Sequence, residues 1–128
     1  MNRIAMLLVG LIAALHFYIA WFEIFAWTTR GPEVFSTLPM NLFEPTQSMA
    51  ANQGLYNAFL AAGLSWSLFI RNAEWRFKVA TCFLSFVAVA GIFGAVTVSQ
   101  KIIVVQTVPA TIALIFVYLG YRQTARAA

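Results

Sequence analysis

The chain has 128 residues, of which 62% are hydrophobic and only 9% are charged, and its formal net charge is +4. A soluble domain of this length has too small an interior to hide so much apolar surface. The composition therefore excludes an ordinary soluble protein. Basic residues at the ends of membrane helices explain the positive charge, so no nucleic-acid partner is expected.

Four segments contain no Asp, Glu, Lys or Arg: 4–22, 45–70, 79–100 and 102–121. Each is long enough to cross about 30 Å of hydrocarbon as a helix that rises about 1.5 Å per residue. They predict an all-α fold, a membrane-spanning four-helix bundle that forms a single transmembrane domain over residues 1–128. The helices are expected at 4–27, 46–70, 76–99 and 103–122.

The first predicted helix carries two ionisable side chains, His16 and Glu23. Seven residues turn a helix by about 700°, so both side chains project from one face. Ionisable groups in a membrane helix usually face the bundle interior or a wet cavity and mark a functional site. The alternative is that Glu23 meets water at the interface and His16 makes one interhelical hydrogen bond.

A long first loop, 28–47, follows this helix. It mixes large apolar side chains with three prolines, which argues against a floppy linker. We expect residues 35–43 to pack on the extracytoplasmic end of the bundle.

The second helix carries four polar side chains within six residues: Asn52, Gln53, Tyr56 and Asn57. One polar side chain is enough to hold two membrane helices together, which is the alternative explanation. Four of them predict the lining of a cavity.

The fourth segment contains Pro109, which cannot donate a hydrogen bond to Val105. The helix is expected either to kink there or to start late, after an irregular stretch at 102–108. Gln106 lies in this stretch. With one histidine and one cysteine in the chain, and no nucleotide-binding motif, we expect no metal site and no cofactor.

The basic residues predict the orientation. If both termini are cytoplasmic, six basic residues lie inside and two lie outside, as the positive-inside rule requires. Counting from the inner basic residues places His16 about 20 Å up, Asn57 about 21 Å and Gln106 about 24 Å. Polar residues of three helices therefore share one layer in the outer leaflet.

Several segments resemble one family of small bacterial membrane proteins, catalogued as domain of unknown function thirteen-oh-four. They are ANQGLYNAFLAAG at 51–63, His16-Phe17-Tyr18 with Glu23, Phe25-Ala26-Trp27, and Phe43-Glu44-Pro45. The resemblance covers nearly the whole chain. It implies four transmembrane helices and a multi-pass protein of the bacterial inner membrane, and it carries no established biochemistry.

These patterns support a buried polar cavity that binds or acts on a lipid-like or small amphipathic molecule, among membrane lipids. In an enzyme, the catalytic residues would be His16 as the acid or base and Glu23, which would orient it or stabilise a cation. The predicted ligand-binding residues are Asn52, Gln53, Tyr56, Asn57 and Gln106. A non-enzymatic permeation or binding protein, and a structural membrane subunit, stay open as alternatives, as does a homodimer.

Overall fold

The computed structural model describes the backbone of residues 1–127 and the side chains of residues 1–124. The backbone described is helical and contains no strand. In chain order its α-helices are α1 (Arg3–Phe25), α2 (Trp27–Val34), α3 (Gln47–Phe69), α4 (Ala73–Thr97) and α5 (Val108–Ala127). A 3₁₀ turn, η1 (Met40–Leu42), precedes α3, and a π-helical turn, η2 (Ile103–Thr107), precedes α5.

Three of the helical stretches described are long and apolar enough to cross a membrane: α1, α4 and Ile103–Thr124. Helix α3 has the same length as α1, 23 residues, but carries more polar side chains. The finding therefore covers three of the four spans that the sequence predicts.

Two helix ends differ from the predicted bounds for local reasons. Helix α1 ends at Phe25 because Ala26 leaves the helical region, with φ −121° and ψ 7°, and the chain turns into α2. Helix α4 begins at Ala73 because the side chain of Asn72 accepts a hydrogen bond from the backbone N–H of Trp75 at 2.9 Å. This is an N-cap, and Glu74 in the first turn suits the positive end of the helix dipole.

The chain divides into two compact units. We call Met1–Ala13 with the residues from Ala62 onward the terminal unit, and Ala14–Ala61 the central unit. Helices α1 and α3 contribute residues to both.

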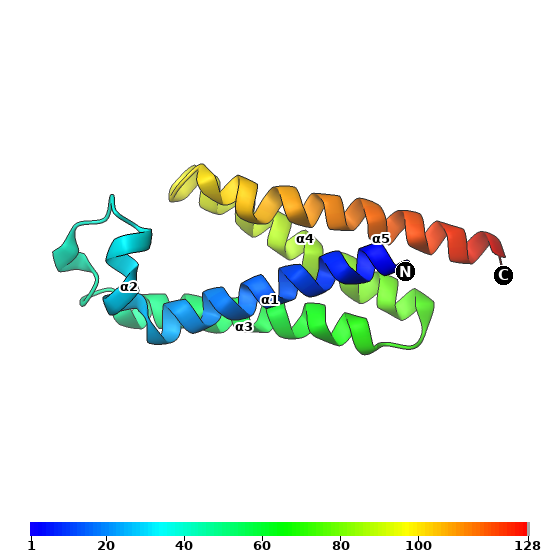
Figure 1. Ribbon diagram of the computed structural model, residues 1–128, viewed down its shortest axis with the longest axis horizontal. Helices are drawn as coiled ribbons and strands as arrows, with labels where there is room; N and C mark the ends of the chain where they lie inside the picture. The colour runs from blue at the N-terminus through cyan, green and yellow to red at the C-terminus, as the bar shows by residue number, and fades with distance from the viewer. Residues whose placement is uncertain (128) are drawn as a thin grey trace. The chain divides into compact units, whose positions relative to one another are not determined.

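In the terminal unit, α4 packs against α5 (Figure 1). A side chain at Gly91 would collide with Thr107, so glycine lets the π-helical turn approach α4. The hydroxyl of Thr107 donates a hydrogen bond to the carbonyl of Ala88 at 3.2 Å, which joins the two elements.

The π-helical turn is the irregular stretch expected before Pro109. Because proline has no N–H, the preceding carbonyls cannot all be satisfied in a regular α-helix, and a wider turn relieves the clash. The regular helix α5 then starts late, at Val108.

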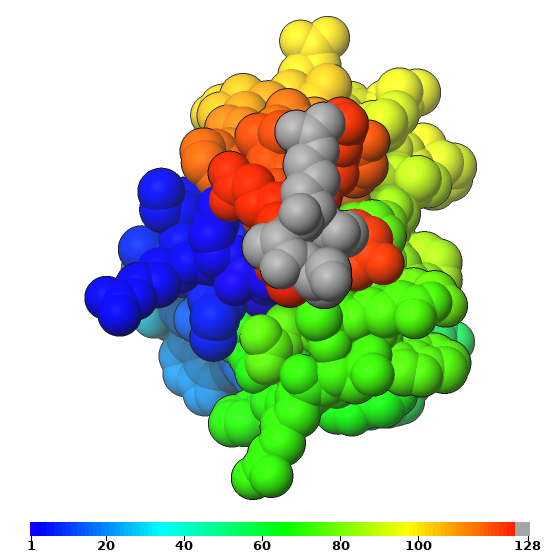
Figure 2. Space-filling view, turned by 90° about the vertical axis from the view of Figure 1, so that its right-hand side faces the viewer, coloured from blue at the N-terminus to red at the C-terminus, as the bar shows by residue number. Residues whose placement is uncertain are grey.

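One end of the terminal unit gathers the N-terminus, the α3–α4 connection and the last part of α5. Figure 2 shows the blue N-terminal residues beside the orange-to-red α5 at this end. A Cβ on Gly120 would lie 2.8 Å from the backbone nitrogen of Asn2. The ring of Phe77 stacks on that of Tyr121 at 4.3 Å, and Arg76 donates to the carbonyl of Ile70 at 2.7 Å.

In the central unit, the segment after α1 folds onto that helix through aromatic side chains. The ring of Trp27 lies 5.3 Å from Phe43 and 5.6 Å from Phe35, and Phe35 lies 6.2 Å from Phe22 of α1. The Trp27 indole N–H donates to the hydroxyl of Thr46 at 3.0 Å. These contacts hold the segment before α3 against α2.

Candidate functional site

A side-chain hydrogen bond joins two of the predicted site residues, Glu23 and Asn57. Asn57 Nδ2 donates a hydrogen bond to Glu23 Oε2 at 2.8 Å, from α3 to α1. The same Nδ2 also reaches the carbonyl of Gln53, one turn earlier, at 3.3 Å. Both side chains are half-buried. The bond uses one carboxylate oxygen, so the carboxylate keeps capacity to accept further hydrogen bonds.

Gly54 brings the two helices close enough for this bond. A Cβ there would lie 2.7 Å from Ile24 Cγ1, 3.0 Å from the carbonyl oxygen of Ala20 and 3.1 Å from the Cβ of Glu23. Glycine is therefore the residue that fits, one helical turn before Asn57. This role of Gly54 was not predicted from the sequence, although small residues are known to let membrane helices approach closely.

His16 lies on the same face of α1 as Glu23, two turns earlier, and only 1% of its surface is exposed. It is one of the largest fully buried side chains in the part of the chain that the structure describes. A buried imidazole in an otherwise apolar helix is costly, which is why such residues often serve a function.

The remaining predicted residues are placed differently. Asn52, Gln53 and Tyr56 are exposed on α3. Tyr56 instead packs edge-on against Phe59 at 6.2 Å. Gln106 is half-buried and belongs to the terminal unit, in the π-helical turn.

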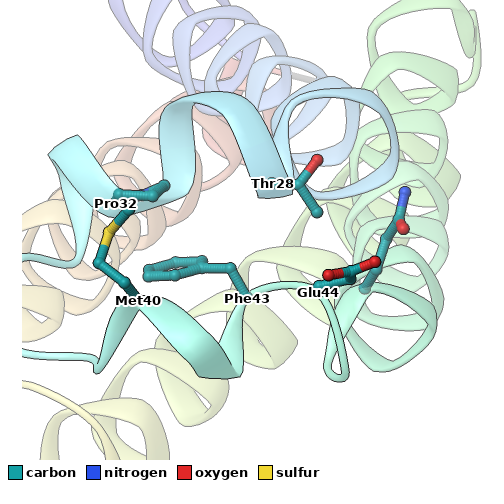
Figure 3. Close-up of a pocket in the computed structure, with 6 residues that line it drawn as sticks. Thr28, Pro32, Met40, Phe43 and Glu44 are labelled. Carbon is teal, nitrogen blue, oxygen red and sulfur yellow. The ribbon is translucent and has the colours of Figure 1, made fainter.

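A pocket of about 360 Å³ lies elsewhere in the central unit, between α2 and the segment that leads into α3 (Figure 3). We call it the α2 pocket. None of the predicted site residues lines it. Its lining residues come from both sides of the long first loop: Thr28, Pro32, Met40, Phe43, Glu44 and Gln47.

Polar and apolar residues occupy different sides of the α2 pocket. In Figure 3, Thr28 and Glu44 lie toward one side, Pro32 and Met40 lie toward the other, and the ring of Phe43 lies between them. The pocket was not predicted, because its residues come from the two ends of the long first loop and are brought together by the contacts of Trp27. Among the residues that the structure describes, no group of three His, Cys, Asp or Glu side chains could hold a metal ion.

The fold and the polar contact define a class: small all-helical proteins whose apolar helices are long enough for a membrane and hold polar side chains between them. Within this class the chain belongs to the family described as protein of unknown function (DUF1304), whose model matches residues 10–118. It is similar to the uncharacterized protein YpaA of Lactococcus lactis subsp. lactis (strain IL1403). The two are 27% identical over 117 residues, which cover 90% of this chain and 97% of the relative. No solved structure matches the chain significantly.

Proposed function

We propose that this protein is a four-helix integral protein of the bacterial inner membrane that binds a lipid-like or small amphipathic molecule at a polar site in the outer leaflet. His16, Glu23 and Asn57 form the centre of the site. The observation that carries the proposal is the 2.8 Å hydrogen bond between Glu23 and Asn57, on two helices that are otherwise largely apolar.

Exposed apolar side chains support the membrane location. Phe69, Phe93 and Val96 are 81%, 70% and 82% exposed, and many other large apolar side chains also lie on the outside. Exposed apolar area costs about 25 cal/mol per Å² in water, whereas in lipid it costs nothing. Helix α3 is the fourth span in this proposal, with its polar residues near the outer end.

The gathering of helix ends in the terminal unit supports the orientation. Arg76 and Lys78 follow the α3–α4 connection, and Arg3 and Arg122 lie near the two chain ends. Because the N-terminus packs beside Gly120 of α5, these basic residues gather at one end. Both termini are then cytoplasmic under the positive-inside rule.

The chemistry of the site suits a ligand with both a polar and an apolar part. The Glu23 carboxylate has free acceptor capacity, and Asn57 fixes its position. His16 lies on the same helix face, and because histidine is a common acid or base in enzymes, it takes that role in this proposal. Asn52, Gln53 and Tyr56 stand as further ligand-binding residues in this proposal.

A second candidate function is that of a structural subunit that pairs with another copy. The exposure of Asn52, Gln53 and Tyr56 on one stretch of α3 favours it, because polar side chains on membrane helices find partners on neighbouring helices.

Native mass spectrometry of the protein purified with total bacterial lipid tests the proposal. The expected result is a bound molecule that Glu23→Gln loses, because the substitution keeps the shape and removes the charge. The matched control is Glu33→Gln, an exposed glutamate of α2, which should retain the molecule. Identical spectra for wild type and Glu23→Gln would leave the structural subunit as the better explanation.

A further inference from the structure

The α2 pocket is an open pocket on the surface of the central unit, separate from the Glu23–Asn57 contact, and four of its lining residues are exposed. Its volume of about 360 Å³ falls within the range of about 300–1,000 Å³ that is usual for small-molecule sites. It combines an apolar side with a few polar groups, as such sites do.

The packing around the pocket holds its two walls in place. One wall is α2, with Thr28 and Pro32, and the other is the segment from Met40 to Gln47. The Trp27–Thr46 hydrogen bond of 3.0 Å joins them, and the hydroxyl of Thr46 in turn donates to the carbonyl of Leu42 at 2.6 Å.

A close approach at Gly31 completes this packing. A Cβ on Gly31 would lie 2.7 Å from the ring of Phe43, so the absence of a side chain lets the ring approach α2. Phe43 is only 2% exposed. The backbone of both walls is therefore held in place before any ligand arrives, which lowers the entropic cost of binding.

Three exposed polar side chains of the pocket each carry an oxygen that can accept a hydrogen bond from a cation. Thr28 offers a hydroxyl, Glu44 a carboxylate and Gln47 an amide oxygen. No basic side chain lines the pocket. In the part of the chain whose side chains are described, the one salt bridge is between Glu74 and Lys78, so Glu44 is not neutralised by an ion pair.

The number of acceptors distinguishes between kinds of cation. A primary ammonium group carries three N–H donors, and the pocket offers three acceptor side chains. A quaternary ammonium group has no N–H donor and can form none of these charge-assisted hydrogen bonds. The apolar side, with Pro32 and Met40, suits the carbon chain attached to the nitrogen.

We propose that the α2 pocket binds the primary ammonium group of an amphipathic amine, with Glu44 as the counter-ion and Thr28 and Gln47 as hydrogen-bond acceptors. Two sources carry this group: the ethanolamine headgroup of a phospholipid and a free alkylamine. The proposal does not depend on the Glu23 site.

Native mass spectrometry in mixed detergent micelles tests it with three probes: dioleoyl phosphatidylethanolamine, dioleoyl phosphatidylcholine and free dodecylamine. We expect the ethanolamine lipid, the amine or both to bind about tenfold more tightly than the choline lipid, as expected for charge-assisted hydrogen bonds. Preference for the lipid over dodecylamine identifies a headgroup site, and the reverse identifies a free-amine site.

Variants connect the preference to the pocket. Thr28→Val should reduce the preference for the primary amines over the choline lipid, and Glu44→Gln should abolish it. Glu33→Gln removes a nearby charge that does not line the pocket, so it should leave the preference intact. Helix content by circular dichroism is measured for each variant. Equal binding of the ethanolamine and choline lipids by wild type, with no binding of dodecylamine, overturns the proposal. So does a folded Glu44→Gln protein that keeps the wild-type preference.

Discussion

At the scale of single residues, the candidate site depends on a position without a side chain as well as on its polar residues. Glu23 of α1 and Asn57 of α3 meet because Gly54 of α3 has no side chain, which lets the two helices approach. The predicted importance of both polar residues came from their type and their depth. Their contact also required this close approach, which residue types alone did not indicate.

We expect Gly54→Ala to destabilise the protein by about 1–3 kcal/mol, as overpacking of a tight contact does. The added Cβ would lie 2.7 Å from Ile24 and 3.0 Å from the backbone of Ala20, so the helices would have to separate. Thermal unfolding in detergent, followed by circular dichroism, measures the change.

The matched control is Gly10→Ala, whose Cβ would meet Leu68 Cδ1 at an ordinary 3.8 Å. This change should be neutral or slightly stabilising, since alanine favours the helix. Equal destabilisation by the two substitutions would show that the Gly54 contact has no special role.

At the scale of elements, local chemistry decides where helices begin and change form. Asn72 starts α4, and Pro109 imposes the π-helical turn before α5. The irregular stretch was predictable because the missing N–H of proline acts within its own segment. The break at Ala26 was not predicted, because no proline or glycine marks it and the helix α2 that follows is held by distant aromatic partners.

We expect Thr107→Val to destabilise the protein by about 1 kcal/mol, the usual net value of a hydrogen bond. The substitution keeps the shape and removes the hydroxyl that joins the π-helical turn to Ala88 of α4. Thr111→Val is the control, because the Thr111 hydroxyl bonds to the carbonyl of Thr107 at 2.7 Å, one turn earlier in the chain, and such a local bond adds little to stability. Thermal unfolding of both variants provides the comparison, and the expectation fails if Thr111→Val costs as much as Thr107→Val.

At the scale of the whole molecule, charge and apolar surface determine how the chain relates to a membrane. The apolar helices keep large side chains on the outside, and most of the basic residues lie at the end where both termini are expected. The proposed orientation uses this asymmetry.

We expect alkaline phosphatase fused after Thr124 to be inactive in living bacteria, since the C-terminus is proposed to be cytoplasmic. The same enzyme inserted after Thr37, in the first loop, should be active because that loop is proposed to lie outside. Immunoblots check that both fusions are made in equal amounts. An active C-terminal fusion would contradict the orientation.

The sequence by itself determined the helical class, the long apolar segments and the family, because these follow from local composition and from runs without charge. It also placed His16 and Glu23 on one face, since helix periodicity is a local property. The tertiary structure decided how α3 is rotated. It turns Asn57 toward Glu23 and leaves Asn52, Gln53 and Tyr56 exposed. It also formed the α2 pocket, whose two walls are joined by contacts such as the Trp27–Thr46 hydrogen bond, between residues 19 positions apart. Helix rotation and long-range packing depend on the fit of many side chains at once, and no single segment carries that information.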